Sequence, residues 1–67
     1  MTKVDARGLN CPEPVLLTKR ALEQGAPVVV LVDDKTPLMN ITRFAENAGY
    51  QVSHELVDGD YAITIQA

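Results

Sequence analysis

The residue best suited to chemistry in this 67-residue chain is Cys11, its only cysteine, which opens the run Cys11-Pro12-Glu13-Pro14. Pro12 suits the first turn of a helix, because its missing N–H is one that a helix could not use there. A thiolate at a helix N-terminus is stabilised by unpaired N–H groups and by the helix dipole. The sequence therefore predicts a functional thiol at Cys11, to which Arg7 and Lys19 could add nearby positive charge.

Several kinds of thiol and metal chemistry are disfavoured. Redox exchange of the Cys-x-x-Cys type needs a second cysteine, and position 14 is proline. A structural zinc site takes four ligands, whereas the chain has one cysteine and one histidine, so neither a metal nor a cofactor is predicted. A hydrolase needs a base beside its nucleophile, and His54 is predicted to be structural, on a strand away from Cys11. What remains is a thiol that carries a group, or a buried free cysteine.

Composition limits the function classes. Apolar residues make up 46% of the chain, and no apolar run approaches the ~20 residues of a membrane span, so no membrane is implied. One domain over residues 1–67 is expected, since the chain is too short for two cores. The lack of a signal-peptide pattern and of paired cysteines favours the cytoplasm. Six basic against nine acidic residues give a net charge of −3, so direct RNA contact is not expected without a local basic patch.

The first half of the chain reads as strand, helix, strand. A short strand is expected over residues 3–5, followed by a helix that starts around Cys11, runs to about Glu23 and ends at Gly25. Leu16 falls on the charged side of this helix. The unbroken apolar run Val28–Val32 is typical of a central strand. The expected core stripe of the helix comprises Val15, Leu17, Thr18, Ala21 and Leu22.

The second half reads as helix, strand, strand. Thr36 as N-cap, followed by Pro37, predicts a helix that extends to Ala48. Residues 51–57 and 61–65 read as strands joined by Asp58-Gly59, the dipeptide that favours a type I′ hairpin. The expected apolar stripe of this helix comprises Pro37, Leu38, Ile41, Phe44, Ala45 and Ala48.

The order β-α-β-α-β-β predicts an α/β (α+β) two-layer sandwich. The right-handed crossover rule makes the first two strands parallel and places both helices on one face of a four-stranded mixed sheet. Loops that leave the C-terminal ends of parallel strands gather at one edge, beside the helix N-termini. Cys11 and residues 33–36 are therefore expected to converge at that edge.

The run from Asp5 through Cys11 to Pro14, continued by residues 15–22, resembles the signature of the TusA/SirA-like sulfur-carrier family. Val32-Asp33-Asp34, the run 40–45 and Gly49-Tyr50 extend the resemblance to nearly the whole chain, and the second half is most similar to the YedF-like branch. The resemblance implies a Cys-Pro-x-Pro cysteine that accepts a persulfide sulfur and relays it to another protein, and the YedF-like branch is associated with selenium metabolism. It also implies the fold of the C-terminal domain of bacterial translation initiation factor 3, with sheet order 1-2-4-3.

Transferred residue by residue, the resemblance assigns the sulfur to Cys11. It implies a carrier rather than a stand-alone enzyme, and as partners a sulfur donor such as a cysteine desulfurase and a downstream acceptor protein. The usual Asp-Asp-Pro pattern is interrupted here by Lys35 and Thr36. Supporting roles in the turn and the loop are implied for Asp5, Arg7, Gly8, Pro12, Pro14 and Lys19.

Two alternatives remain open from the residues themselves. One is a regulatory module that binds RNA or protein around Lys19, Arg20 and Arg43, and the other is a redox sensor in which the thiol is oxidised. Leu16 and Met39 fall outside the apolar stripes of their helices. The candidates for contacts with a partner protein are therefore Leu16, Met39, Arg43 and Asp34.

Overall fold

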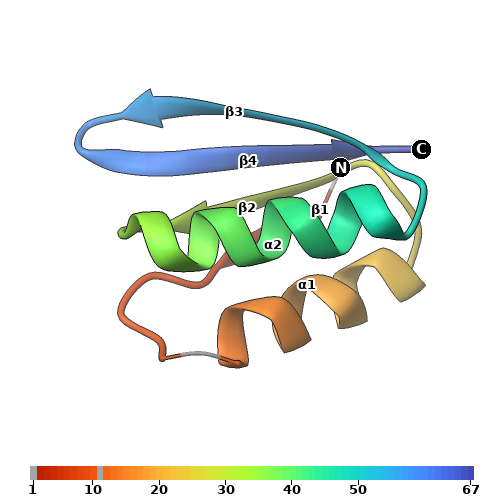
Figure 1. Cartoon of the computed structure of the whole chain (residues 1–67), viewed down its shortest axis with the longest axis horizontal. Helices are drawn as coiled ribbons and strands as arrows, with labels where there is room; N and C mark the ends of the chain where they lie inside the picture. Colours follow the sequence, from red (N-terminus) through yellow and green to blue (C-terminus); the bar gives the residue numbers. More distant parts are fainter. Residues whose placement is uncertain (1, 11) are drawn as a thin grey trace.

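The computed structural model describes residues 2–10 and 12–67, which form a sheet covered on one face by two helices (Figure 1). The elements in chain order are β1 (Thr2–Asp5), α1 (Glu13–Glu23), β2 (Val28–Val32), α2 (Lys35–Asn47), β3 (Gln51–Val57) and β4 (Asp60–Gln66). The four strands lie in the order β1-β2-β4-β3. β1 and β2 are parallel, and β4 is antiparallel to both of its neighbours. The predicted fold class and sheet order are confirmed.

Helix α1 starts later than the sequence predicts. Its first residue is Glu13, two positions after Cys11, because the N-cap Pro12 has φ −97° and ψ 13°, outside helical values. Leu16 is 42% exposed on the outer side, as expected. Thr18 is fully buried, and its hydroxyl donates to the carbonyl oxygen of Pro14 at 2.8 Å, so this polar core residue is satisfied.

The start of α2 corrects the predicted cap. Asp34, not Thr36, is the N-cap residue, and its side chain accepts a hydrogen bond from the Lys35 N–H at 2.6 Å. A carboxylate at this position satisfies an unpaired N–H and also faces the positive end of the helix dipole. Pro37 is consequently the third helical residue, where its missing N–H removes no intrahelical bond. At the other end, Ala48 is an exposed C-cap rather than part of the apolar stripe.

The hairpin between β3 and β4 has the predicted turn. Val57 pairs with Asp60, and the two residues between them have positive φ values, 51° at Asp58 and 85° at Gly59. Positive φ at both central residues defines a type I′ turn, whose twist matches that of the flanking strands. The hairpin therefore has a tight, two-residue connection.

The core lies between the sheet and the helices. Every second residue of β2 faces the helices and is fully buried, while Val29 and Leu31 on the open face are half-buried. Figure 1 shows that the N-terminal ends of both helices lie at the same edge of the molecule as the β3–β4 hairpin. In the described parts of the chain, neither helix is long and apolar enough to cross a membrane. Fully buried aliphatic side chains include Val28, Val30, Val32, Ile41, Ile63 and Ile65.

Candidate functional site

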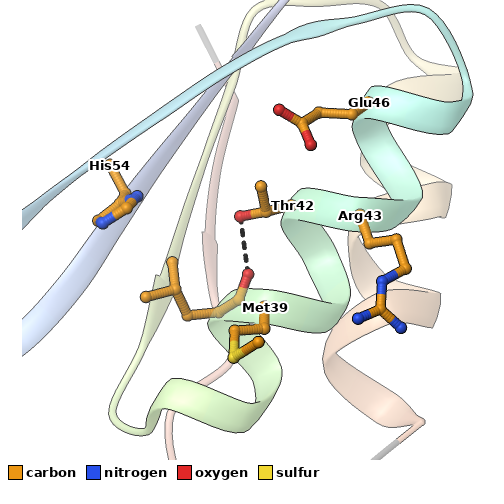
Figure 2. Close-up of a pocket in the computed structure, with 6 residues that line it drawn as sticks. Met39, Thr42, Arg43, Glu46 and His54 are labelled. Atoms are coloured by element: carbon orange, nitrogen blue, oxygen red, sulfur yellow. Dashed lines mark hydrogen bonds between the residues drawn. The ribbon is translucent and has the colours of Figure 1, made fainter.

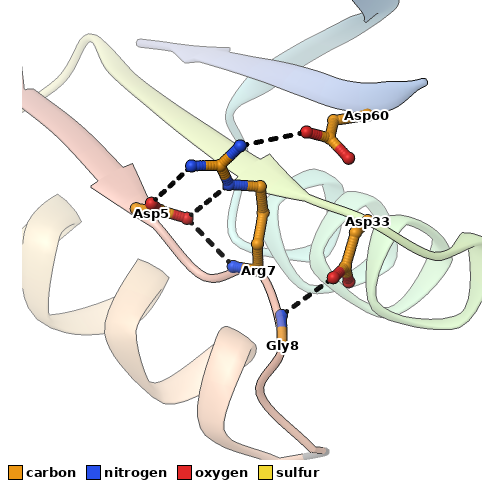
Figure 3. A network of polar contacts seen from close by, with 5 residues as sticks. All are labelled: Asp5, Arg7, Gly8, Asp33 and Asp60. Atoms are coloured by element: carbon orange, nitrogen blue, oxygen red, sulfur yellow. Dashed lines mark hydrogen bonds and ion pairs between the residues drawn. The ribbon is translucent and has the colours of Figure 1, made fainter. Parts of the chain in front are cut away.

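Arg7 ties the loop that follows β1 to two other parts of the chain. Its Nε and Nη2 donate to Oδ1 and Oδ2 of Asp5, each at 2.9 Å, and its Nη1 donates to Oδ2 of Asp60 at 3.1 Å (Figure 3). The backbone N–H of Arg7 also donates to Asp5 Oδ1 at 3.1 Å. A two-pronged pairing of guanidinium with carboxylate holds both groups in one plane. Arg7 therefore acts as a clamp that joins the end of β1 to the start of β4.

The clamp changes the ionisation of its members. The side-chain and backbone hydrogen bonds from Arg7 lower the pKa of Asp5 from 3.8 to about 2. The bonds to Asp5 and then to Asp60 raise the pKa of the Arg7 guanidinium. Because two carboxylates already pair with it, Arg7 is better placed to hold the loop than to supply free positive charge. The role that the family resemblance implies for Asp5 and Arg7 is consistent with this geometry.

The ionisation of Asp5 predicts how the clamp responds to acid. Asp5 releases its proton at lower pH in the folded chain than in the unfolded chain, so its contribution to stability is complete above the unfolded pKa of 3.8. That contribution is lost as the pH falls through the folded value of about 2. We therefore expect the urea midpoint to fall over this window and the Asp5→Asn variant to show a smaller fall. Urea titrations from neutral to acid pH measure both.

A matched control for this prediction is Glu55→Gln, because Glu55 is an exposed acid on β3, outside the clamp. This variant should retain the part of the acid response that depends on Asp5. An Asp5→Asn variant whose midpoint falls as steeply as that of the unchanged chain would contradict the clamp's contribution.

A second contact joins the β1–α1 loop to the loop between β2 and α2. The backbone N–H of Gly8 donates to Asp33 Oδ2 at 3.0 Å, as Figure 3 shows, and Gly8 has φ +76°, which favours glycine. The two loops enclose a solvent-open hollow of about 390 Å³. The predicted convergence of these loops is thus present, whereas Cys11 itself lies outside the described residues. The hollow is lined by Gly8, Leu9, Asn10, Asp33, Asp34, Thr36 and Pro37.

The residues on either side of the motif cysteine form a compact helix start. The N–H of Glu13 donates to the carbonyl oxygen of Asn10 at 2.9 Å, and the N–H of Leu16 donates to that of Pro12 at 3.0 Å. Pro14 lies in the first turn, as the sequence predicts, and its side chain is buried. Pro12 and Pro14 therefore shape the beginning of α1.

Lys19 does not join this group of residues. It borders a separate hollow of about 180 Å³ between the helices, with Glu23 and Phe44 among its other lining residues. Lys19 follows the N-cap Pro12 by about two helical turns. The structure therefore gives Lys19 no contact with the Arg7 clamp or with the hollow beside Gly8.

The candidate partner contacts are also dispersed. Met39, 58% exposed, and Arg43 border a third hollow of about 300 Å³ between α2 and β3, together with His54 (Figure 2). His54 stacks edge-on against Tyr61, with ring centroids 6.2 Å apart. Asp34 is engaged as the α2 cap, and Leu16 lies on α1. Among the described residues, no group of three His, Cys, Asp or Glu side chains could hold a metal ion.

Two members of the site could not be assigned a contact from local sequence. Asp60 pairs with Arg7 across 53 positions, and Asp33 pairs with Gly8 across 25. The signal that could have found Asp60 is the sheet order, because the start of β4 lies beside the end of β2. For the pair to form, the Arg7 side chain then needs only to extend past the end of β2 to Asp60.

Comparison with known proteins decides the family. A family model described as Sulfurtransferase TusA matches residues 2–67. The chain belongs to the TusA family. Over 55 residues it is 53% identical to a protein of Methanocaldococcus jannaschii that is provisionally named sulfur carrier protein MJ0990. This match covers 78% of this chain and 73% of the relative. It is 33% identical, over 60 residues, to the provisionally named Bacillus subtilis sulfur carrier protein YrkI, covering 85% of this chain and 80% of the relative.

A solved structure confirms the TusA-family fold. The crystal structure of a SirA-like protein from Desulfitobacterium hafniense matches with a TM-score of 0.95 and 38% identity. The match covers 100% of this chain and 97% of that one. The described loops therefore belong to a TusA-type sandwich, and the names of the relatives support a role as a sulfur carrier.

Proposed function

We propose that this chain carries sulfur as a persulfide on Cys11 and relays it from a donor protein to an acceptor protein. Membership of the TusA family supports the carrier role. The observation that carries the proposal is the position of the only cysteine in the sequence. It directly follows the loop that Arg7 holds against the start of β4 and that Gly8 holds against the β2–α2 loop. A held loop supports transfer, because a nucleophile must meet its target in a defined direction.

The proposed loading step is an exchange at sulfur. The thiolate of Cys11 attacks the outer sulfur of a persulfide on the donor, a new S–S bond forms, and the donor's S–S bond breaks. The donor leaves as a thiolate, and Cys11 becomes a persulfide. In the unloading step an acceptor nucleophile attacks the outer sulfur and Cys11 leaves as a thiolate. The electrons balance in both steps, so no external oxidant or reductant is needed.

The surroundings of the motif support docking of a partner protein. The hollow beside Gly8 is open to solvent, and two exposed leucines flank the cysteine in sequence: Leu9 is 40% exposed and Leu16 is 42% exposed. Exposed aliphatic side chains beside a reactive group are suited to a transient protein interface. We infer that donor and acceptor use this surface in turn.

The cargo and the compartment are part of the same proposal. A thiol that must stay reduced between transfers suits the cytoplasm, where disulfides rarely persist. The resemblance of the second half to the YedF-like branch makes selenium the second cargo to be tested beside sulfur.

Intact-protein mass spectrometry tests the proposal. The chain is incubated with a cysteine desulfurase and cysteine, and a mass increase of one sulfur atom that a thiol reductant removes is expected. Selenocysteine in place of cysteine, with a desulfurase that also cleaves selenocysteine, supplies selenium already bound to the donor's cysteine. A mass increase of one selenium atom then shows that Cys11 accepts it by the same exchange. A chain that never gains the sulfur mass, with several desulfurases, would overturn the carrier proposal.

Leu16→Lys tests the docking surface. Leu16 is half-exposed on α1, so the variant should fold, while a charge in an apolar contact should slow loading by about tenfold. The matched control is Leu56→Lys, which places the same charge on β3, where Leu56 is 66% exposed. Loading rates from timed mass spectra make the comparison. Equal rates for Leu16→Lys and the unchanged chain would remove Leu16 from the docking surface.

A further inference from the structure

The free edge of β3 has few of the features that usually prevent edge-to-edge association. β3 ends the sheet, so among the described residues one side of this strand has no strand partner. Its seven residues contain neither lysine nor proline, and their one carboxylate is that of Glu55. Their pairing with β4 runs without a bulge from Gln51 to Val57. Edge strands are usually protected by one of these devices. The opposite edge, β1, is four residues long and carries Lys3.

The hairpin determines which backbone groups point outward from β3. In a two-residue hairpin the pair that flanks the turn, here Val57 and Asp60, exchanges hydrogen bonds, and the pairs then alternate along the strands. The N–H and C=O groups of Val57, Glu55 and Ser53 are therefore directed to β4. Those of Leu56, His54 and Val52 are directed to the free edge.

We propose that two copies of this chain pair through β3, antiparallel about a two-fold axis at His54, to form one sheet that runs through both copies. This inference is independent of the thiol chemistry and goes beyond the proposed function. The axis lies on an outward-directed residue, so His54 of each copy would exchange hydrogen bonds with its equivalent. On either side, Val52 would pair with Leu56 of the second copy, which satisfies the remaining outward groups. Such self-complementary pairing is the usual form of a symmetric dimer.

The side chains favour this register over its neighbours. It overlaps all seven residues of β3 and places Ser53 opposite Glu55 of the second copy, where a hydroxyl can donate to a carboxylate. A two-fold axis at Glu55 would instead oppose two carboxylates. An axis at Ser53 would leave Leu56 and Val57 beyond the partner strand.

The exposure of the apolar residues points to the same edge. Leu56, at 66%, is the most exposed of the large apolar side chains named among the described residues, and its pairing with Val52 of a second copy would cover it. The hollow between α2 and β3 is bordered by Met39 and by His54 of this strand (Figure 2). Pairing through β3 would bring the equivalent residues of the second copy next to that hollow.

Sedimentation over a range of concentrations tests the pairing. The full chain should show a concentration-dependent equilibrium between monomer and dimer, and Leu56→Lys should weaken the dimer about tenfold or more, because a charge replaces an apolar contact at the edge. This variant also reduces the net negative charge, so a weaker dimer cannot come from stronger repulsion between copies. Leu16→Lys is the matched control and should dimerise as the unchanged chain does. A chain that remains monomeric up to millimolar concentration would overturn the proposal, as would a Leu56→Lys variant that dimerises normally.

Disulfide trapping tests the register without relying on Leu56. Two variants are prepared separately in a Cys11→Ser background, one with Ser53→Cys and one with Glu55→Cys, and are tested alone and mixed. Directly opposed residues of a non-hydrogen-bonded pair are close enough for a disulfide, whereas equivalent positions of the two copies are offset along the strands. Mild oxidation should therefore form a disulfide between the two variants in the mixture, whereas each variant alone should form little cross-linked dimer. Equal cross-linking of the variants alone and in the mixture would refute the axis at His54.

Discussion

Cys11→Ser is expected to abolish sulfur loading completely. A serine hydroxyl is not ionised near neutral pH, and it cannot form the S–S bond in which the cargo is held. Intact-mass spectra after incubation with a desulfurase and cysteine should therefore show no sulfur adduct. Transfer to an acceptor protein should fall to the rate measured without the chain. This is the largest functional effect expected from a single substitution.

The control for this variant is its fold. Circular dichroism and urea unfolding of the variant are compared with those of the unchanged chain, and a match shows that the core formed by the two helices, β2 and β4 is intact. Cys11→Ala provides a second test if the serine variant folds poorly. Sulfur loading that persists on either folded variant would mean that another group accepts the cargo.

Ile41→Ala is expected to have the largest effect on stability. Ile41 lies on α2 and is fully buried in the core between the helices and the sheet. Removal of a buried isoleucine side chain beyond Cβ costs about 2–5 kcal/mol, as lost apolar burial plus an unfilled cavity. At 67 residues the whole free energy of unfolding is roughly 3–10 kcal/mol. Urea unfolding should thus show a midpoint that falls by a large fraction, or a chain unfolded without urea.

The matched control for Ile41→Ala is Met39→Ala, on the same helix. Met39 is 58% exposed, so its truncation should change the free energy of unfolding by about 0.5 kcal/mol or less. Both substitutions also place alanine, a good helix former, in α2, so helix propensity does not account for a loss of stability. Comparable losses from the two variants would contradict the assignment of the core to the inner face of α2.

Much of the fold could be predicted because its helices and turns leave patterns among residues that are close in sequence. The apolar stripe of α1 predicts which residues face the sheet, and Thr18 and Leu22 are indeed buried. Asp58-Gly59 predicts a turn that needs positive φ at both residues, which the structure has. These features depend on residues within a few positions of one another, so they are visible in the sequence.

The predictions that were wrong concern choices between neighbouring residues. Thr36 and Asp34 can both cap a helix, and the tertiary structure selects Asp34 because β2 ends only two residues before the helix. Ala48 fits the apolar period of α2, yet the helix ends before it and leaves it exposed. The apolar periodicity continues through Ala48, so it does not show where the helix stops packing against the core.

The order of the elements, the fold class and the single thiol of Cys11, in a Cys-Pro-x-Pro run that resembles the TusA family, can all be predicted from the sequence. The folded chain was needed to show that Arg7 pairs with Asp60 as well as with Asp5, and that Lys19 lies away from this clamp. The physical reason is distance along the chain: periodicity and capping act between near neighbours, whereas the loop contacts join positions that only the assembled sheet brings together.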